Sequence, residues 1–102
     1  MTSKQRAYLK GIAMTTDPIL QLGKNCLTPE FEKAVDEALE ARELIKISVL
    51  QNCDDDPMTM ARTMAEHTHS EVVQVIGKKI VLYRPGKKDK KKIELPPAKK
   101  KA

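Results

Sequence analysis

The sequence predicts a compact α/β sandwich, a four-stranded mixed sheet with three helices in the order α-β-α-β-α-β-β. Helical and strand-like hydrophobic patterns alternate along the chain, proline follows a capping residue at the start of two helical segments, and a short glycine-containing turn separates the last two strand patterns. In a chain of 102 residues, we expect one folded domain over residues 1–86 and a lysine-rich tail over 87–102.

The first two predicted elements are a helix over residues 2–14 and a short strand over 19–22. The helix carries apolar side chains on one face, which we expect to enter the core. These residues are Tyr8, Leu9, Ile12 and Ala13. Asp17 and Pro18 end the helical pattern, and the mostly apolar strand follows them.

The segment over residues 29–42 has the clearest helical pattern. Thr28 is a good N-cap, and Pro29 occupies the first helical position, where no intrahelical N–H bond is needed. Apolar residues recur at intervals of three and four, with acidic residues on the opposite face. They are Phe31, Ala34, Val35, Ala38 and Leu39. Residues 44–50 then alternate apolar and polar side chains, which predicts a half-buried strand.

The last part of the predicted domain repeats this punctuation. An acidic residue before Pro57 predicts a helix over residues 57–67. Its inner stripe is predicted to be Met60, Ala61, Met64 and Ala65. Residues 72–76 and 80–83 are predicted strands, and Gly77-Lys78-Lys79 between them indicates a tight β-hairpin.

The net charge of +5 is unevenly distributed along the chain. Residues 87–102 carry eight lysines and two acidic residues, whereas residues 1–86 carry 11 basic and 12 acidic side chains. Within the predicted domain the basic residues come early, and acidic residues cluster over 30–43. A molecule with one basic side and one acidic side can orient on a polyanion.

Several classes of function lack their residues in this sequence. There is no P-loop, G-x-S-x-G motif or paired carboxylate motif, so we expect no enzyme and no cofactor. His67 and His69 lack zinc-site spacing, and Cys26 and Cys53 suit neither a disulfide framework nor a zinc site, so we expect no metal. Cys53 is expected to be a small buried hydrophobe. Without a signal peptide or an apolar run of membrane-spanning length, the sequence predicts a cytoplasmic protein with no membrane partner.

The segment from Gly23 to Thr28 is the predicted binding site. It ends at the start of the helix over 29–42, where backbone N–H groups and the helix dipole favour an anion. Gly23 allows close approach of another backbone, and Lys24 adds a positive charge. We therefore predict that this loop contacts a nucleic-acid backbone, together with basic residues elsewhere. The predicted contact residues are Gly23, Lys24, Asn25, Cys26, Thr28, Lys4, Arg6, Lys10, Lys78, Lys79 and Arg84.

The composition favours RNA over DNA as the ligand. Stacking on single strands needs exposed aromatic side chains, and the chain has only Tyr8, Phe31 and Tyr83. Reading a DNA groove needs a helix with basic or amide side chains, which the acidic segment over 30–43 does not supply. Backbone and shape contacts with structured RNA fit the residues better.

Four segments of the chain resemble a known family. They are Ser3-Lys4-Gln5-Arg6 with Leu9-Lys10-Gly11, Leu22-Gly23-Lys24-Asn25, Glu37-Ala38-Leu39-Glu40-Ala41-Arg42-Glu43-Leu44-Ile45-Lys46, and Val75-Ile76-Gly77-Lys78-Lys79-Ile80-Val81-Leu82-Tyr83-Arg84-Pro85. In this order, over nearly all of residues 3–95, they resemble the bacterial stand-alone CRM domain of the YhbY-type RNA-binding proteins.

The resemblance implies a fold similar to the C-terminal domain of bacterial translation initiation factor 3. It also implies association with 23S ribosomal RNA in precursors of the large (50S) subunit and a role in ribosome assembly. We expect the protein to be a monomer. The proposed RNA contact of the family is a G-x-x-G loop like that of KH domains. Gly23, Lys24 and Asn25 match this loop, but Cys26 replaces its second glycine. If that position needs a positive φ, cysteine costs on the order of 1 kcal/mol, so we expect a weakened or reshaped contact.

Two alternatives stay open from the sequence. The acidic helix, with Glu32, Asp36 and Glu40, would bind a basic ribosomal protein in a protein-interaction module for which RNA contact is incidental. Alternatively, Cys26 would carry a redox or thiol function, because a helix N-terminus can activate a thiol.

Overall fold

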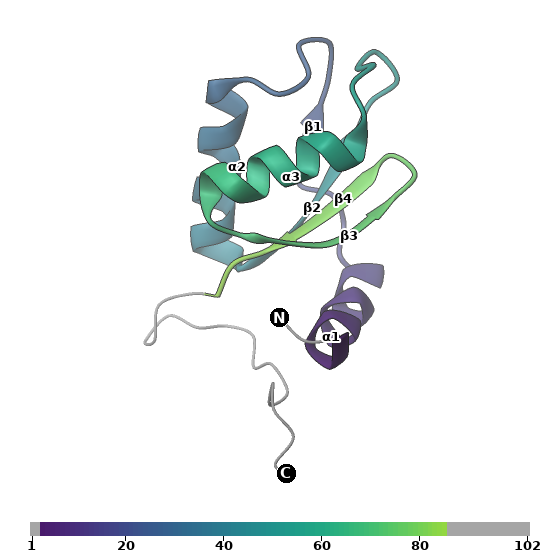
Figure 1. Cartoon of the computed structure of the whole chain (residues 1–102), viewed down its shortest axis with the longest axis vertical. Helices are drawn as coiled ribbons and strands as arrows, with labels where there is room; N and C mark the ends of the chain where they lie inside the picture. Colours follow the sequence, from purple (N-terminus) through teal and green to yellow (C-terminus); the bar gives the residue numbers. More distant parts are fainter. Residues whose placement is uncertain (1–2, 86–102) are drawn as a thin grey trace.

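The computed structural model describes residues 3–85, so the expected tail over 87–102 lies outside the described part. Its elements are helices α1 (Ser3–Met14), α2 (Pro29–Arg42) and α3 (Pro57–Thr68), and strands β1 (Leu20–Leu22), β2 (Leu44–Val49), β3 (Glu71–Ile76) and β4 (Lys79–Tyr83). The predicted order is confirmed, and every end lies within one residue of its predicted position (Figure 1). No helix in this part of the chain is long and apolar enough to cross a membrane.

The four strands form one mixed sheet in the order β1-β2-β4-β3. β1 and β2 are parallel and are joined through α2, whereas β4 lies between β2 and β3 and is antiparallel to both. A register shift between Val72 and Gln74 marks a β-bulge in β3, which the sequence pattern did not indicate. The mixed sheet expected from the alternation of strands and helices is therefore confirmed.

The helices cover both faces of this sheet, and alternate residues of β4 show how. Ile80 and Leu82 pack into the larger core with α2 and α3, while Val81 and Tyr83 pack on the other face with α1. Figure 1 shows α1 set apart from the other two helices. The predicted inner residues of α2 and α3 lie in or against the larger core, apart from Ala34, which is only half-buried.

Local signals set the element ends as expected. The Thr28 hydroxyl accepts a hydrogen bond from the Phe31 N–H at 3.1 Å, and Asp56 accepts one from the Thr59 N–H at 3.0 Å. Each cap precedes a helix that begins with proline. In the hairpin, Gly77 has a φ of 56°, as the first central residue of a type II′ turn requires. The predicted hairpin is confirmed.

One predicted core residue is on the surface. Leu9 and Ala13 are buried under α1, but Tyr8 is 45% exposed, so its expected place in the core is wrong. The helix presents a narrow stripe to the sheet, formed by residues four apart. Tyr8 precedes Leu9 and therefore lies about 100° around the helix from it.

Candidate nucleic-acid interface

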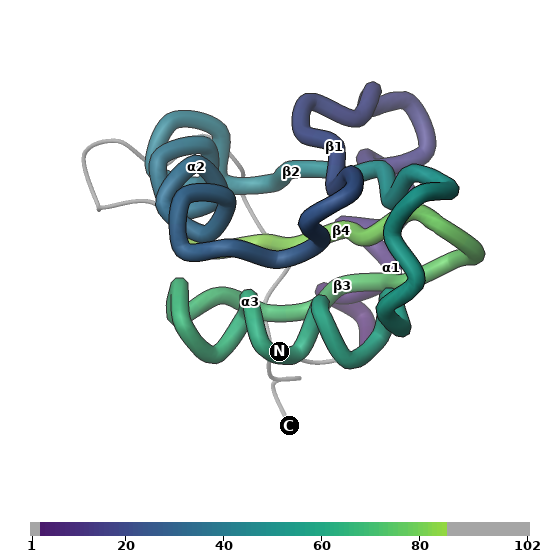
Figure 2. The backbone as a smooth tube through the Cα atoms, turned by 90° about the horizontal axis from the view of Figure 1, so that it is seen from above, coloured from purple at the N-terminus to yellow at the C-terminus, as the bar shows by residue number. Residues whose placement is uncertain are grey.

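Three connections meet at one end of the sheet. Because β1 and β2 are parallel, with Leu22 opposite Val49, the loops over residues 23–28 and 50–56 leave their strands side by side. The β3–β4 hairpin lies at the same end, where the Val49 N–H donates to the Lys78 carbonyl at 2.7 Å. Figure 2 looks down on this end of the molecule, where the chain runs from β1 to α2. The register therefore brings together the predicted loop and the predicted basic hairpin.

The predicted loop contains a tight turn with free donors. The Cys26 N–H donates to the Gly23 carbonyl at 2.8 Å, so Lys24 and Asn25 occupy the centre of the turn and are exposed. The N–H groups of Lys24 and Asn25 have no acceptor within residues 3–85. Successive free amides in a turn form an anion-binding surface. A phosphate oxygen can accept from these amides with the Lys24 ammonium group beside it.

Position 26 has the backbone conformation that favours glycine. The φ of Cys26 is 52°, in the left-handed region, where a non-glycine residue costs about 1 kcal/mol or more. At Gly23, by contrast, an added Cβ would meet its nearest neighbours, side-chain atoms of Leu50 and Asn52, at an ordinary 3.8 Å. The packing around position 23 therefore leaves room for a side chain.

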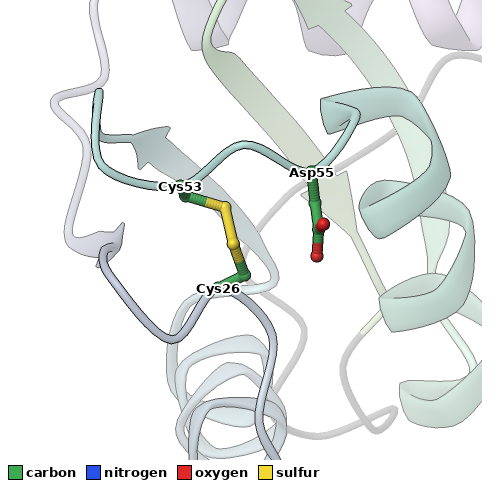
Figure 3. Close-up of side chains that lie close together, drawn as sticks. All are labelled: Cys26, Cys53 and Asp55. Atoms are coloured by element: carbon green, nitrogen blue, oxygen red, sulfur yellow. A yellow bond between two sulfur atoms is a disulfide. The ribbon is translucent and has the colours of Figure 1, made fainter.

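The structure joins the two cysteines, which corrects the expectation that they suit no disulfide. Cys26 and Cys53 are bonded, with their Cα atoms 5.2 Å apart and a sequence separation of 27 (Figure 3). Cys53 is buried as predicted, but as half of a cystine. The sequence could not show this pairing, because the two loops become neighbours only through the parallel register of β1 and β2.

The disulfide lies next to an acidic side chain. Within residues 3–85, one group of three side chains of the types that bind metal ions (His, Cys, Asp and Glu) has all its ligand atoms within 4.8 Å of one another. This group is Cys26, Cys53 and Asp55. Figure 3 shows the Asp55 carboxylate alongside the bridge. In the disulfide neither sulfur is a thiolate, which is the form that binds metals.

The start of α2 offers less to an anion than the sequence suggested. The Phe31 and Glu32 N–H groups already donate to Thr28, to its hydroxyl and its carbonyl, and Pro29 has no N–H. In the described chain, only the Glu30 amide of the first turn has no acceptor. Glu30 and Glu32 also place carboxylates there, where they stabilise the helix. The preceding turn is therefore the better anion site, and Thr28 serves as a cap.

Both predicted arginines have partners inside the fold. The Arg6 Nη1 atom donates to the Val72 carbonyl at 2.6 Å and fastens α1 to β3. Arg84 follows β4 at the opposite end from the hairpin and connects α2 with the end of α3. Its guanidinium donates to Asp36 Oδ1 at 2.6 Å, Thr68 O at 2.8 Å, Asp36 O at 2.9 Å and Glu40 Oε1 at 3.4 Å.

The predicted lysines, in contrast, are exposed. Lys4 and Lys10 lie on α1, and Lys78 and Lys79 lie at the hairpin. A groove of about 150 Å³ lies between the C-terminal end of α1 and the hairpin, with Met14 of α1 and Lys79 among its lining residues. Tyr8, exposed on α1, adds an aromatic surface that sequence reasoning had placed in the core. Helical spacing gave no signal for this exposure, because the other adjacent apolar pair of the helix, Ile12 and Ala13, packs in or against the core.

Negative charge is also present at this end of the molecule. Asp54, Asp55 and Asp56 follow β2 and are exposed, with Asp56 capping α3. Three carboxylates thus accompany the lysines of the turn and the hairpin. Binding to a polyanion here depends on the placement of Lys24 and the free amides rather than on a large local net charge.

Comparisons with known proteins identify the family of the chain. Residues 1–84 match the model of the CRS1/YhbY (CRM) domain. The chain is 46% identical over 96 residues to the Bacillus subtilis protein named "Probable RNA-binding protein YqeI", across 94% of this chain and 99% of that protein. It is 34% identical over 96 residues to an RNA-binding protein of Haemophilus influenzae, across 94% and 95% of the two chains. The solution structure of SAV1595 from Staphylococcus aureus matches with a TM-score of 0.78 at 49% identity, across 94% of this chain and 100% of that one.

Proposed function

This chain belongs to the CRS1/YhbY (CRM) domain family, and on that basis we propose that it is a non-enzymatic protein that binds structured RNA. Its proposed ligand is 23S ribosomal RNA in precursors of the large ribosomal subunit, and its proposed role is to assist assembly of that subunit. We further propose that it acts as a cytoplasmic monomer.

The turn from Gly23 to Cys26 is the observation that carries this proposal. Its two central N–H groups are free within the described chain, and Lys24 is exposed beside them. Amides and a lysine in this arrangement suit a phosphate oxygen and carry no base specificity. Recognition then depends on where the RNA backbone runs, as expected for structured RNA.

Four further lysines extend this contact. They are Lys4, Lys10, Lys78 and Lys79, all exposed. Arg6 and Arg84 are assigned to the fold instead, because their guanidinium groups already donate to carbonyl or carboxylate oxygens. The lysines of residues 87–102 supply additional attraction that is independent of sequence.

The alternative function, a protein-interaction module acting through the acidic face of α2, has less support. Its three expected contact residues have partners within the molecule. Glu32 lies 2.6 Å from the His67 ring nitrogen, and Asp36 and Glu40 accept from Arg84. A basic partner would have to compete with these contacts.

Salt dependence tests the proposal. Binding of the full chain to transcribed 23S ribosomal RNA is measured at salt concentrations from about 50 to about 200 mM, a range over which phosphate contacts lose affinity strongly. If the five proposed contact lysines all bind phosphate, they contribute about −3.5 to −4.5 to the slope of log affinity against log salt, and the lysines of residues 87–102 make the slope steeper. A flat dependence would contradict the proposal. Lys24→Glu is expected to weaken binding more than deletion of residues 87–92, and the reverse result would move the main contact to the tail.

A further inference from the structure

The disulfide joins the proposed RNA-binding turn to the loop after β2. Cys26 is partly buried on the turn, and Cys53 is fully buried beyond β2. Among the described residues, the only hydrogen bond made by the backbone of residues 23–27 is that from the Cys26 N–H to the Gly23 carbonyl. The disulfide therefore fixes this turn against the rest of the fold, together with the packing of Leu27 against the larger core.

Cys26 is the residue of the turn that most needs such a restraint. Its φ of 52° lies in the left-handed region. The cost of this conformation for a non-glycine residue lowers its population about five- to thirtyfold. Release of the bond lets Cys26 relax toward a negative φ. The peptide plane between Asn25 and Cys26 turns with it, and this plane carries the Cys26 N–H that donates to the Gly23 carbonyl. Loss of that hydrogen bond opens the turn, so the free amides of Lys24 and Asn25 are no longer held in one arrangement.

We propose that Cys26 and Cys53 form a thiol–disulfide switch that sets the RNA affinity of this turn, with the disulfide form binding more tightly. The switch depends on the proposed RNA-binding function and on the proposed cytoplasmic location. In a reducing cytoplasm the thiols are the resting form, and disulfides there are usually transient and redox-sensing. Oxidising conditions would then strengthen the contact with RNA.

The exchange reaction begins at Cys26, because its residue is partly exposed and Cys53 is not. A thiolate of a cellular dithiol attacks Cys26 Sγ, the bond between the cysteines breaks, and Cys53 leaves as a thiolate that takes up a proton. The second thiolate of the dithiol then attacks the first sulfur of the same dithiol, which is bonded to Cys26 in the mixed disulfide. Cys26 leaves as a thiolate and is protonated. The protein gains two electrons and two protons, and the dithiol becomes a disulfide. A low-molecular-weight disulfide reverses the reaction.

The buried thiol released in this reaction keeps an apolar environment. Cys53 Sγ lies 3.9 Å from Met60 Sδ, a contact between two sulfurs in which no hydrogen is shared while the disulfide exists. After reduction the thiol can donate weakly to this sulfur. The buried side of the switch therefore has a suitable place for both states, and the change is concentrated in the turn.

The test compares the two redox states of the full chain. Affinity for transcribed 23S ribosomal RNA is measured after treatment with oxidised glutathione and after dithiothreitol, and alkylation followed by mass spectrometry counts the free thiols. We expect reduction to weaken binding about fivefold and re-oxidation to restore it. Equal affinity in the two states, or tighter binding by the reduced form, would overturn the switch while leaving the proposed function standing. Absence of binding in both states would overturn both.

Two variants separate the bond from the conformation that it holds. Cys53→Ser cannot form the bond, so its affinity should equal that of the reduced protein with or without dithiothreitol. Cys26→Gly permits a positive φ without a crosslink, so its affinity should exceed that of Cys53→Ser and should not change on addition of dithiothreitol. A response of Cys26→Gly to dithiothreitol equal to that of the natural chain would also overturn the switch. Thermal melts confirm that each variant is folded before binding is compared.

Discussion

Replacing Arg84 with alanine is expected to destabilise the fold by about 2–3 kcal/mol while leaving the RNA affinity of the folded protein unchanged. Sequence reasoning placed this arginine among the RNA contacts. In the structure its side chain is only 18% exposed and holds α2 and the end of α3 against the end of β4. The variant therefore separates a structural role from a binding role.

The magnitude follows from the acceptors that Arg84→Ala leaves behind. The carbonyls of Thr68 and Asp36, at 2.8 and 2.9 Å, lose a charged donor, at about 1 kcal/mol each. The Asp36 and Glu40 side chains are 57% and 49% exposed, so their ion pairs add together no more than about 1 kcal/mol. For a domain of this size, the total lowers the melting temperature by about 10–20 °C.

The assay is thermal unfolding followed by circular dichroism, with RNA binding measured well below both transitions. Arg62→Ala is the matched control, because Arg62 is exposed on α3 and has no partner among residues 3–85. Arg62→Ala should melt within about 2 °C of the natural chain. A loss for Arg84→Ala as small as that of the control would refute the structural role. A tenfold loss of RNA affinity without a change in melting would place Arg84 in the interface.

Two further substitutions test the role of Thr28 as the cap of α2 and the burial of the Tyr83 hydroxyl. Thr28→Ala removes the hydroxyl that caps α2 and should lower the free energy of unfolding by about 1 kcal/mol, with Thr28→Ser retaining most of it in urea titrations. If Thr28→Ala left stability unchanged but weakened RNA binding, the hydroxyl would be a contact rather than a cap. The Tyr83 hydroxyl is buried without a partner in the described chain, and burial, followed by the charge of Glu43, raises the pKa of Tyr83. The folded state therefore keeps the Tyr83 proton where the unfolded chain, with an ordinary tyrosine pKa of about 10, releases it, so stability falls as pH rises above that value. Tyr83→Phe should lose less stability between about pH 9 and 11 than the natural chain, and equal losses in urea titrations would contradict the assignment.

Most of the fold was predictable because its signals are local. The apolar period of α2, the alternation in β2 and the two cap-then-proline starts depend on neighbouring residues only. The β-bulge between Val72 and Gln74 was missed because no glycine or proline marks it. Tyr8 was misplaced because helical spacing gives a face but not the width of the stripe that the sheet covers.

The residues of the candidate site could be predicted from the sequence, but their contacts within the fold could not. Lys24, Asn25 and the turn that presents them follow from a short segment of sequence. The roles of Arg84 and of the two cysteines depend on contacts between segments 16 to 48 residues apart, which only the sheet register and helix packing create. Charge type alone could not distinguish a lysine free to bind phosphate from an arginine already held inside the fold.

The most direct measurement of the central claim compares Lys24→Glu with Lys33→Glu in binding to transcribed 23S ribosomal RNA. Both lysines are exposed, and both substitutions change the net charge equally, but Lys33 lies within α2 and not in the turn. Lys24→Glu should weaken binding about tenfold and reduce the salt slope by about 0.7–0.9, whereas Lys33→Glu should change affinity less than about threefold. Equal losses from the two substitutions would contradict the assignment of the Gly23–Cys26 turn as the RNA contact.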